Sequence, residues 1–178
     1  MKEFFLFSCQ KLSVHKSHVT DITNASRTLL CNIQTGQWDP ELLQLLEIPK
    51  EIILPQIRSC SEHFIDIADG KFAGIPITGC LGDQQAALVG NQCLNPGQAK
   101  ATYGTGCFLL FNIGNSIKYS SCGLLTTVGF QFGSKSDIVY ALEVNALFLE
   151  LILKGCRLLM YMTGIYKLSR ISNHMDEG

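Results

Sequence analysis

The sequence predicts an α/β protein, because three patterns place both helices and strands along its 178 residues. Asp39-Pro40-Glu41, followed by leucines, is typical of a helix N-terminus. An apolar segment at 75–81 precedes Gly82-Asp83-Gln84-Gln85, and this order predicts a strand that leads into a helix. Apolar stretches between 99 and 144, separated by glycine-containing turns, predict antiparallel strands.

The first half of the chain contains two expected helices and one expected strand. Asp39 can cap the first helix, Pro40 suits its first position, and the leucines that follow share one face. Pro76 lies at the start of the strand 75–81, where its missing N–H does least harm. The second helix is expected to hold Asp83 in its first turn.

The second half predicts a meander, that is, neighbouring strands joined by short turns. The expected strands are 99–103, 107–113, 124–132 and 138–144. The stretch 145–170 is apolar and about as long as a membrane span, but it carries charges near its middle. Because charges are costly in lipid, this stretch favours a helix outside the membrane.

Composition and charge exclude several classes of protein. With 14 Lys and Arg against 15 Asp and Glu, the net charge is −1, so we expect no nucleic-acid partner. Hydrophobic residues make up 47% and charged residues 16%, which excludes a disordered chain and allows a packed core. The same balance is more apolar than in a typical soluble monomer, so we expect surfaces that another part or protein covers.

The eight cysteines are scattered, and no C-x-x-C pair is present. Zinc and iron–sulfur sites need closely spaced ligand pairs, so no metal site is predicted. Cys60 and His63 form the nearest approach to such a pair, which alone is a weak signal. The apolar run at 4–7 is too short for a signal peptide, so we expect reduced thiols in a cytoplasmic protein.

Two segments contain residues suited to catalysis. In the first, Asp83 stands at a strand-to-helix corner, where a carboxylate can take a proton from a hydroxyl and the adjacent amide can bind a polyol. The alternative is that Asp83 only caps the helix. In the second, Gly104, Thr105 and Gly106 separate two strands, and such a turn can hold a phosphate with backbone amides and a hydroxyl.

The turn at 104–106 also has an alternative interpretation, an ordinary hairpin turn. It is no Walker loop, because no Lys-Ser or Lys-Thr follows, and no dinucleotide fingerprint, because a strand follows rather than a helix. A base in one segment and a phosphate site in the other together favour phosphoryl transfer to a hydroxyl.

From about His18 to Glu143 the chain resembles the glycerol kinases of the FGGY carbohydrate kinase family. The motifs that carry this resemblance are His18 to Thr28, Gly82-Asp83-Gln84-Gln85-Ala86-Ala87-Leu88, Ala99-Lys100, Thr102-Tyr103-Gly104-Thr105-Gly106-Cys107-Phe108 and Gly123-Leu124-Leu125-Thr126-Thr127. The resemblance implies the ribonuclease-H-like fold of the actin-like ATPases, with partial pieces of two domains. It also implies ATP-dependent phosphorylation of glycerol to glycerol 3-phosphate.

The same resemblance assigns the site residues. It implies that Asp83 is the catalytic base, that Gln84 contacts glycerol, and that Gly104, Thr105 and Gly106 bind the nucleotide phosphates. ATP and Mg²⁺ are the expected cofactors, since a metal ion neutralises phosphate charge. The family allows a homo-oligomer, and we expect no membrane association.

Residues 18–90 are expected to be the end of the N-terminal kinase domain, and 91–144 the start of the C-terminal one. Segments 1–17 and 145–178 are expected to be divergent, because neither matches the family. The family's first phosphate loop and its adenosine-binding part have no counterpart here. We therefore expect an internal fragment with little or no kinase activity alone; the alternatives are a non-catalytic, poorly folded fragment or interaction piece, and a membrane-associated protein.

Overall fold

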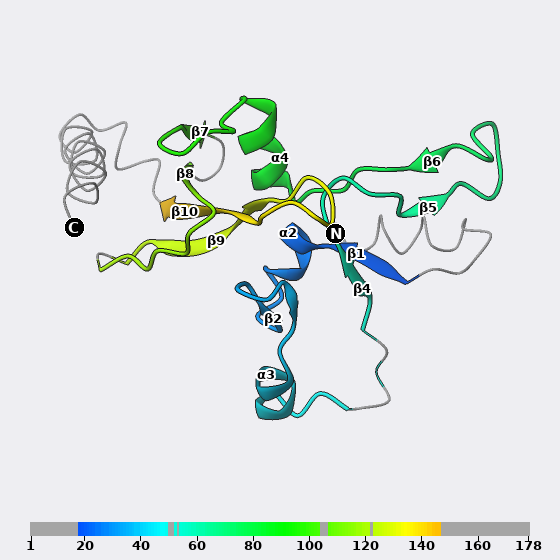
Figure 1. Ribbon diagram of the computed structural model, residues 1–178, viewed down its shortest axis with the longest axis horizontal. Helices are drawn as coiled ribbons and strands as arrows, with labels where there is room; N and C mark the ends of the chain where they lie inside the picture. Colours follow the sequence, from blue (N-terminus) through cyan, green and yellow to red (C-terminus); the bar gives the residue numbers. More distant parts are fainter. Residues whose placement is uncertain (1–17, 50–51, 53, 104–106, 122, 147–178) are drawn as a thin grey trace.

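The computed structural model describes residues 18–49, 52, 54–103, 107–121 and 123–146 (Figure 1). The predictions for 1–17, for the turn at 104–106 and for 147–178 lie outside these residues. The described chain forms a four-stranded sheet with a helix against it, and two arms extend from this body. No helix within the described ranges is long and apolar enough to cross a bilayer.

The sheet contains β7 (Ala99–Tyr103), β8 (Cys107–Gly114), β9 (Leu125–Phe130) and β10 (Val139–Ala146), all antiparallel to their neighbours. All four strands were expected, but the meander is wrong, because the order is β7-β8-β10-β9. The connection 115–124 is longer than a hairpin turn, so β9 need not pair with β8. β10 therefore lies between them and pairs with both.

Helix α4 (Asp83–Gly90) packs against this sheet, as the sequence predicts for a helix that starts near Asp83. Leu88 is fully buried and reaches the backbone of β9 at Gly129, where a Cβ would lie 3.5 Å from the leucine Cδ2 and 3.2 Å from the carbonyl of Val139. A residue without a side chain at 129 therefore lets the helix and β10 approach β9 closely.

The first residues described form a small parallel unit beside the sheet. β1 (Val19–Asp21) pairs with β4 (Gln56–Arg58), and the short helix α2 (Ile22–Ala25) follows β1 directly. Ile22 is buried in the same core cluster as Leu88 and the strands of the sheet. Two hydrogen bonds also join the first part of the chain to the four-stranded sheet and its loops. They run from Cys60 N to Gln131 O (2.8 Å) and from the Tyr140 hydroxyl to Ile33 O (3.0 Å).

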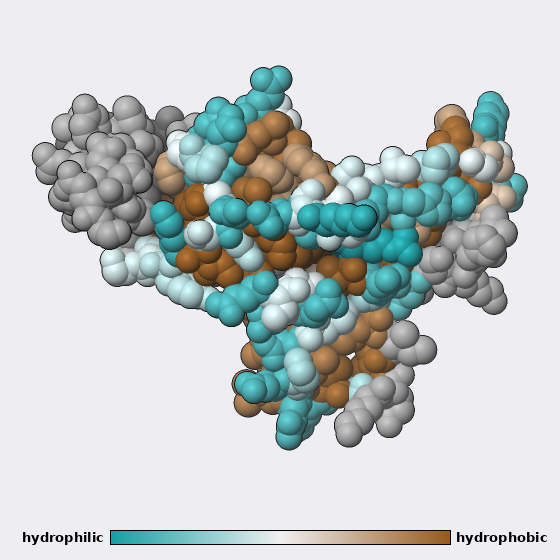
Figure 2. All heavy atoms as spheres, in the orientation of Figure 1, coloured by the Kyte–Doolittle hydropathy of each residue, from teal (hydrophilic) through white to brown (hydrophobic). Residues whose placement is uncertain are grey.

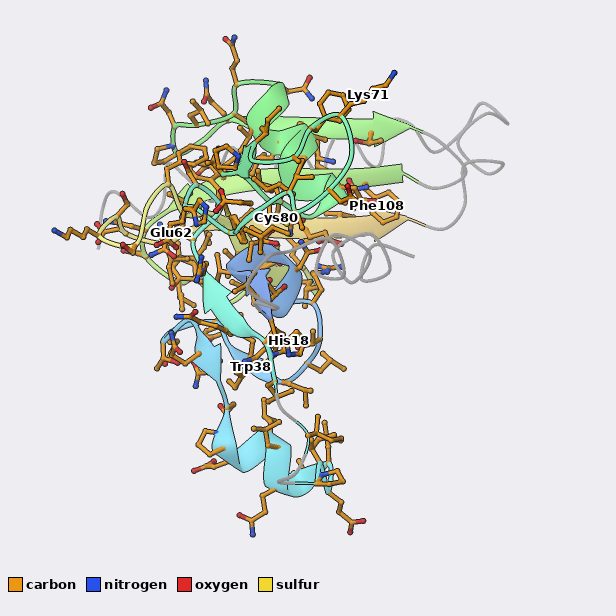
Figure 3. All side chains as sticks on the ribbon, turned by 90° about the vertical axis from the view of Figure 1, so that its right-hand side faces the viewer. His18, Trp38, Glu62, Lys71, Cys80 and Phe108 are labelled. Carbon is orange, nitrogen blue, oxygen red and sulfur yellow. The ribbon has the colours of Figure 1, made fainter. Side chains whose placement is uncertain are left out.

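One arm is the hairpin of β5 (Ile65–Asp66) and β6 (Pro76–Ile77), seen at the right of Figure 1. The predicted strand 75–81 is wrong in its extent, because only Pro76–Ile77 pairs with a neighbour. Residues 78–81 instead run past Cys60, whose carbonyl accepts from Cys80 N at 3.1 Å. Lys71 lies at the far end of this arm (Figure 3).

The other arm contains β2 (Cys31–Asn32), β3 (Gln37–Trp38) and α3 (Pro40–Leu45). The predicted cap is confirmed, because Asp39 accepts from Glu41 N at 3.0 Å and from Leu42 N at 3.2 Å. The helix buries none of its residues, however, and Leu45 is 75% exposed. Figure 2 shows apolar surface on this arm.

Candidate active site

The start of α4 is held by a hydrogen bond to a side chain of α2. The hydroxyl of Thr23 accepts from Gly82 N at 2.8 Å, and Gly82 is the N-cap residue of α4. Thr23 is itself fixed by Asp21, a fully buried carboxylate that caps α2 and accepts from Thr23 N at 2.8 Å. This chain of contacts fixes where α4 begins.

Asp83 occupies the first turn of α4 and its side chain is exposed. The N-cap position belongs to Gly82, which receives no side-chain cap, but the alternative that Asp83 only serves the start of the helix stays open. The carboxylate of Asp83 accepts from the backbone N–H of Gln84 at 2.7 Å. An exposed carboxylate beside the positive end of a helix is suited to act on a bound hydroxyl.

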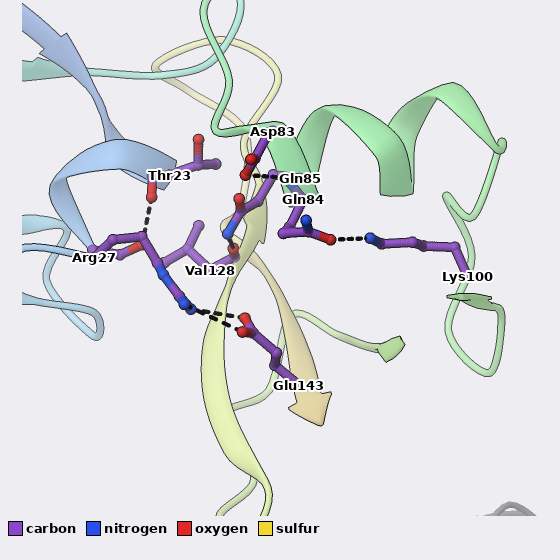
Figure 4. Close-up of polar contacts among 9 residues, drawn as sticks. Thr23, Arg27, Asp83, Gln84, Gln85, Lys100, Val128 and Glu143 are labelled. Atoms are coloured by element: carbon purple, nitrogen blue, oxygen red, sulfur yellow. Dashed lines mark hydrogen bonds and ion pairs between the residues drawn. The ribbon is translucent and has the colours of Figure 1, made fainter. Parts of the chain in front are cut away.

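Gln85, the next residue of the motif, was given no role of its own by the sequence. It is 2% exposed, and its Nε2 donates to Val128 O at 3.2 Å, which ties α4 to β9 (Figure 4). A Cβ at Gly82 would lie 2.6 Å from Gln85 Oε1, so a side chain at position 82 would displace the glutamine. The pattern Gly-x-x-Gln could have indicated this contact only with knowledge of the sheet beside it.

Gln84 faces β7 rather than β9. Its Oε1 accepts from the ammonium of Lys100 (Figure 4). The same ammonium also donates to the Thr102 hydroxyl at 2.8 Å. Lys100 is only 4% exposed, so its charge is held within the protein by these acceptors. The sequence placed Gln84 at the site but gave no role to Lys100 beyond its place in a motif.

An ion pair beside the site joins β10 of the sheet to the segment that follows α2. The Arg27 guanidinium donates to Glu143 with two nitrogens, at 2.7 and 3.2 Å (Figure 4). The Glu143 side chain is 2% exposed, whereas that of Arg27 is 42% exposed. This bidentate geometry fixes β10 against the segment that follows α2.

The thiols of Cys60 and Cys80 lie close to the buried carboxylate of Asp21 and to its neighbour Asn24. Cys60 Sγ lies 3.9 Å from Asp21 Oδ2, and Cys80 accepts from Asn24 Nδ2 at 3.8 Å (Cys80 is labelled in Figure 3). Burial raises the pKa of both thiols from 9.0 to about 12, and the nearby Asp21 adds to the rise. These thiols stay protonated at neutral pH, and no cluster of metal ligands occurs among the described side chains.

The predicted phosphate-binding residues Gly104, Thr105 and Gly106 lie outside the described residues. The strand that leads to them, β7, is described through Tyr103 and lies next to α4. Of the predicted site residues, the structure therefore describes the adjacent Asp83 and Gln84 at the start of α4, and Gln84 is hydrogen-bonded to Lys100 of β7.

Comparison with known proteins decides the family. A model of the N-terminal domain of the FGGY family of carbohydrate kinases matches residues 6–90. A probable glycerol kinase of Caenorhabditis elegans is 55% identical over 127 residues, which are 71% of this chain and 25% of that protein. This chain belongs to the FGGY family of carbohydrate kinases. It spans about a quarter of the length of the curated relatives it matches.

Two further matches agree with this family assignment. The glycerol kinase of Pseudomonas syringae pv. tomato is 53% identical over 133 residues, 75% of this chain and 25% of that enzyme. The crystal structure of Plasmodium falciparum glycerol kinase with ADP superposes with a TM-score of 0.71 and 41% identity, over 76% of this chain and 28% of that one. The expected FGGY kinase fold, in partial form, is therefore confirmed.

Proposed function

We propose that this FGGY chain carries the polyol-binding part of a glycerol kinase site, for ATP-dependent phosphorylation of glycerol to glycerol 3-phosphate. The observation that carries the proposal is the exposed carboxylate of Asp83 beside the Gln84 amide at a rigidly held helix start. The similarity to glycerol kinases at 53–55% identity supports the choice of glycerol as the polyol.

In the proposed reaction Asp83 accepts the proton of a terminal glycerol hydroxyl as that oxygen attacks the γ-phosphorus of ATP. The bond from this phosphorus to the bridging oxygen breaks, and ADP leaves. Gln84 binds a neighbouring hydroxyl, which holds the attacking oxygen in line. Thr105, with Gly104 and Gly106, is proposed to bind the nucleotide phosphates.

Mg²⁺ supplies charge neutralisation at the phosphates when it is bound. This ion usually takes one or two protein carboxylates together with phosphate oxygens and water. Asp83 has the role of base in this proposal, and the described side chains contain no group of three metal ligands, so the phosphates and water would supply most of the ion's ligands.

The domain division is proposed at residue 90, with 18–90 in the N-terminal and 91–144 in the C-terminal kinase domain. The family model for the N-terminal domain ends at the same residue, which supports the boundary at 90, but it begins at residue 6 rather than 18. A cytoplasmic location and a homo-oligomer remain predictions.

Equilibrium dialysis with radiolabelled glycerol tests the proposal without requiring turnover. We expect saturable binding by the full chain that Asp83→Ala abolishes. The matched control is Asp69→Ala, which removes another exposed carboxylate that accepts from the following backbone amide at 2.7 Å. No saturable binding, or equal loss in both variants, would contradict the proposal.

A second candidate, a non-catalytic interaction piece, is favoured by exposed apolar side chains. Leu29, Leu45 and Tyr119 are 78%, 75% and 72% exposed. Light scattering of the purified chain distinguishes the two: association that glycerol leaves unchanged, together with no glycerol binding, supports this candidate.

A further inference from the structure

We infer that Lys100 is a positioning residue that fixes which end of the Gln84 amide faces a bound polyol. The use of that amide by a polyol rests on the proposed function, but the orientation itself can be measured without any ligand. The argument starts from the three groups that meet between α4 and β7.

The first step concerns the donors and acceptors. An ammonium group has three N–H donors and no acceptor, whereas a glutamine amide has one acceptor oxygen and two N–H donors. Because Lys100 can only donate, the oxygen of Gln84 must face it, as the hydrogen bond from Nζ to Oε1 shows. The NH₂ group of Gln84 is then fixed as the other end of the amide.

The second step concerns the position of Lys100. Lys100 and Thr102 are two residues apart on β7 and therefore share one face of the strand. The Thr102 hydroxyl accepts from Nζ at 2.8 Å, which holds the ammonium opposite α4. At 4% exposure, Lys100 has little freedom to turn away into water.

The third step gives the consequence for binding. The carboxylate of Asp83 accepts hydrogen bonds, and the fixed NH₂ of Gln84 donates them. Adjacent residues therefore present one acceptor and one donor, which match the O–H and the oxygen of neighbouring hydroxyls. With a free amide rotor the donor would be present only part of the time, so Lys100 raises affinity by preorganisation.

The side-chain amide of Gln84, observed by ¹⁵N–¹H NMR on the full chain without ligand, tests the orientation. We expect that Lys100→Met moves the Gln84 NH₂ signals to the positions of exposed glutamines, whereas Lys135→Met, at an exposed lysine between β9 and β10, leaves them in place. Unchanged Gln84 signals in folded Lys100→Met overturn the inference. If Lys100→Met does not fold, Thr102→Val replaces it, and the same shift or its absence decides.

Glycerol affinity then separates positioning from a purely structural role. We expect Lys100→Met to raise the Kd for glycerol about two- to tenfold, because the freed amide must give up its other orientations when glycerol binds. Gln84→Glu keeps an acceptor for Lys100 but removes the donor, so it should weaken glycerol binding while the melting temperature holds. Gln84→Glu binding glycerol as tightly as the natural chain would overturn this step.

The two proposals can fail separately. A Gln84 amide that responds to Lys100→Met in a chain that binds no glycerol supports the orientation by Lys100 and contradicts the proposed function. Glycerol binding that depends on Asp83 but not on Lys100 supports the function and overturns the inference.

Discussion

Gly82 is the residue at which the starts of α2 and α4 meet. Its N–H is bonded to Thr23, and the space beside its Cα is filled by the amide of Gln85, 2.6 Å from where a Cβ would be. We predict that Gly82→Ala lowers the free energy of unfolding by about 1–3 kcal/mol, because Gln85 must give up its place against β9. Urea denaturation measures this loss.

Gly90 provides the matched control in the same helix. A Cβ there meets nothing within 4 Å, so Gly90→Ala should leave stability unchanged or raise it by up to about 1 kcal/mol. Equal destabilisation by both alanines would show that the contact with Gln85 is not the cause.

The two partners of the Arg27–Glu143 ion pair differ in exposure to water: the carboxylate is buried and the guanidinium is partly exposed. Arg27→Met leaves a buried charge without its partner and should cost about 1–3 kcal/mol. Glu143→Gln leaves an arginine that water can reach and should cost less. A double-mutant cycle measures both; a larger cost for Glu143→Gln would contradict this reading of the burial.

The thiols of Cys60 and Cys80 give a prediction about pH. Their folded pKa of about 12 lies above the unfolded value of 9.0, so the folded state holds the protons more tightly. Their contribution to stability is complete below pH 9 and is lost as the pH rises toward 12. Urea denaturation should therefore show a free energy of unfolding that falls between pH 9 and pH 12, and falls less steeply in Cys60→Ala; the same slope in both chains would contradict it.

At the scale of elements, α3 is stabilised by its own cap rather than by burial. Asp39 accepts from two backbone amides and from the Asn32 side chain at 3.1 Å, and no residue of the helix is buried. We predict that Asp39→Ala costs about 1 kcal/mol of local stability. Hydrogen exchange should show less protection at Leu43 and Leu46 with no change in β8.

The control for this prediction is Glu41→Ala, an exposed change in the same first turn that leaves the cap in place. It should alter the protection of α3 by no more than about 0.5 kcal/mol. If both variants expose β8 to exchange as well, α3 would not open as a separate unit.

The elements also show which signals in the sequence were sufficient. Local chemistry predicted the cap at Asp39, the helix after Gly82 and all four strands of the sheet, because each depends on neighbouring residues. The sheet order was predicted wrongly as a meander, since the choice of β10 over β9 as the partner of β8 is made by contacts distant in sequence. The strand at 75–81 failed similarly, because β5 pairs with only two of its residues.

The sequence identified some residues of the candidate site and missed others, for the same reason. Asp83 and Gln84 were found because their motif carries hydroxyl chemistry and a family resemblance. Gln85, Lys100 and the Arg27–Glu143 pair were not, because their partners lie on other elements and only the fold brings them together. The burial of Asp21 beside two cysteines likewise has no local signal.

At the scale of the whole molecule, residues on both sides of the proposed domain boundary share one core. Ile22, Leu88 and Val128 belong to the same buried cluster, and the site at the start of α4 lies beside it. The arms that carry α3 and the β5–β6 hairpin expose apolar side chains instead, Leu45 and Phe72 among them. The proposed polyol site therefore lies beside the packed core, whereas the helix of the α3 arm buries none of its residues.

The most direct test is a map of backbone amide shifts as glycerol is titrated into the full chain. We predict that the largest changes fall on Gly82, Asp83 and Gln84, with smaller ones on β7 at Lys100, and that Asp83→Ala removes them. Shifts confined to the β5–β6 hairpin or to α3, or a spectrum that glycerol leaves unchanged at millimolar concentration, would contradict the assignment of a polyol site to the start of α4.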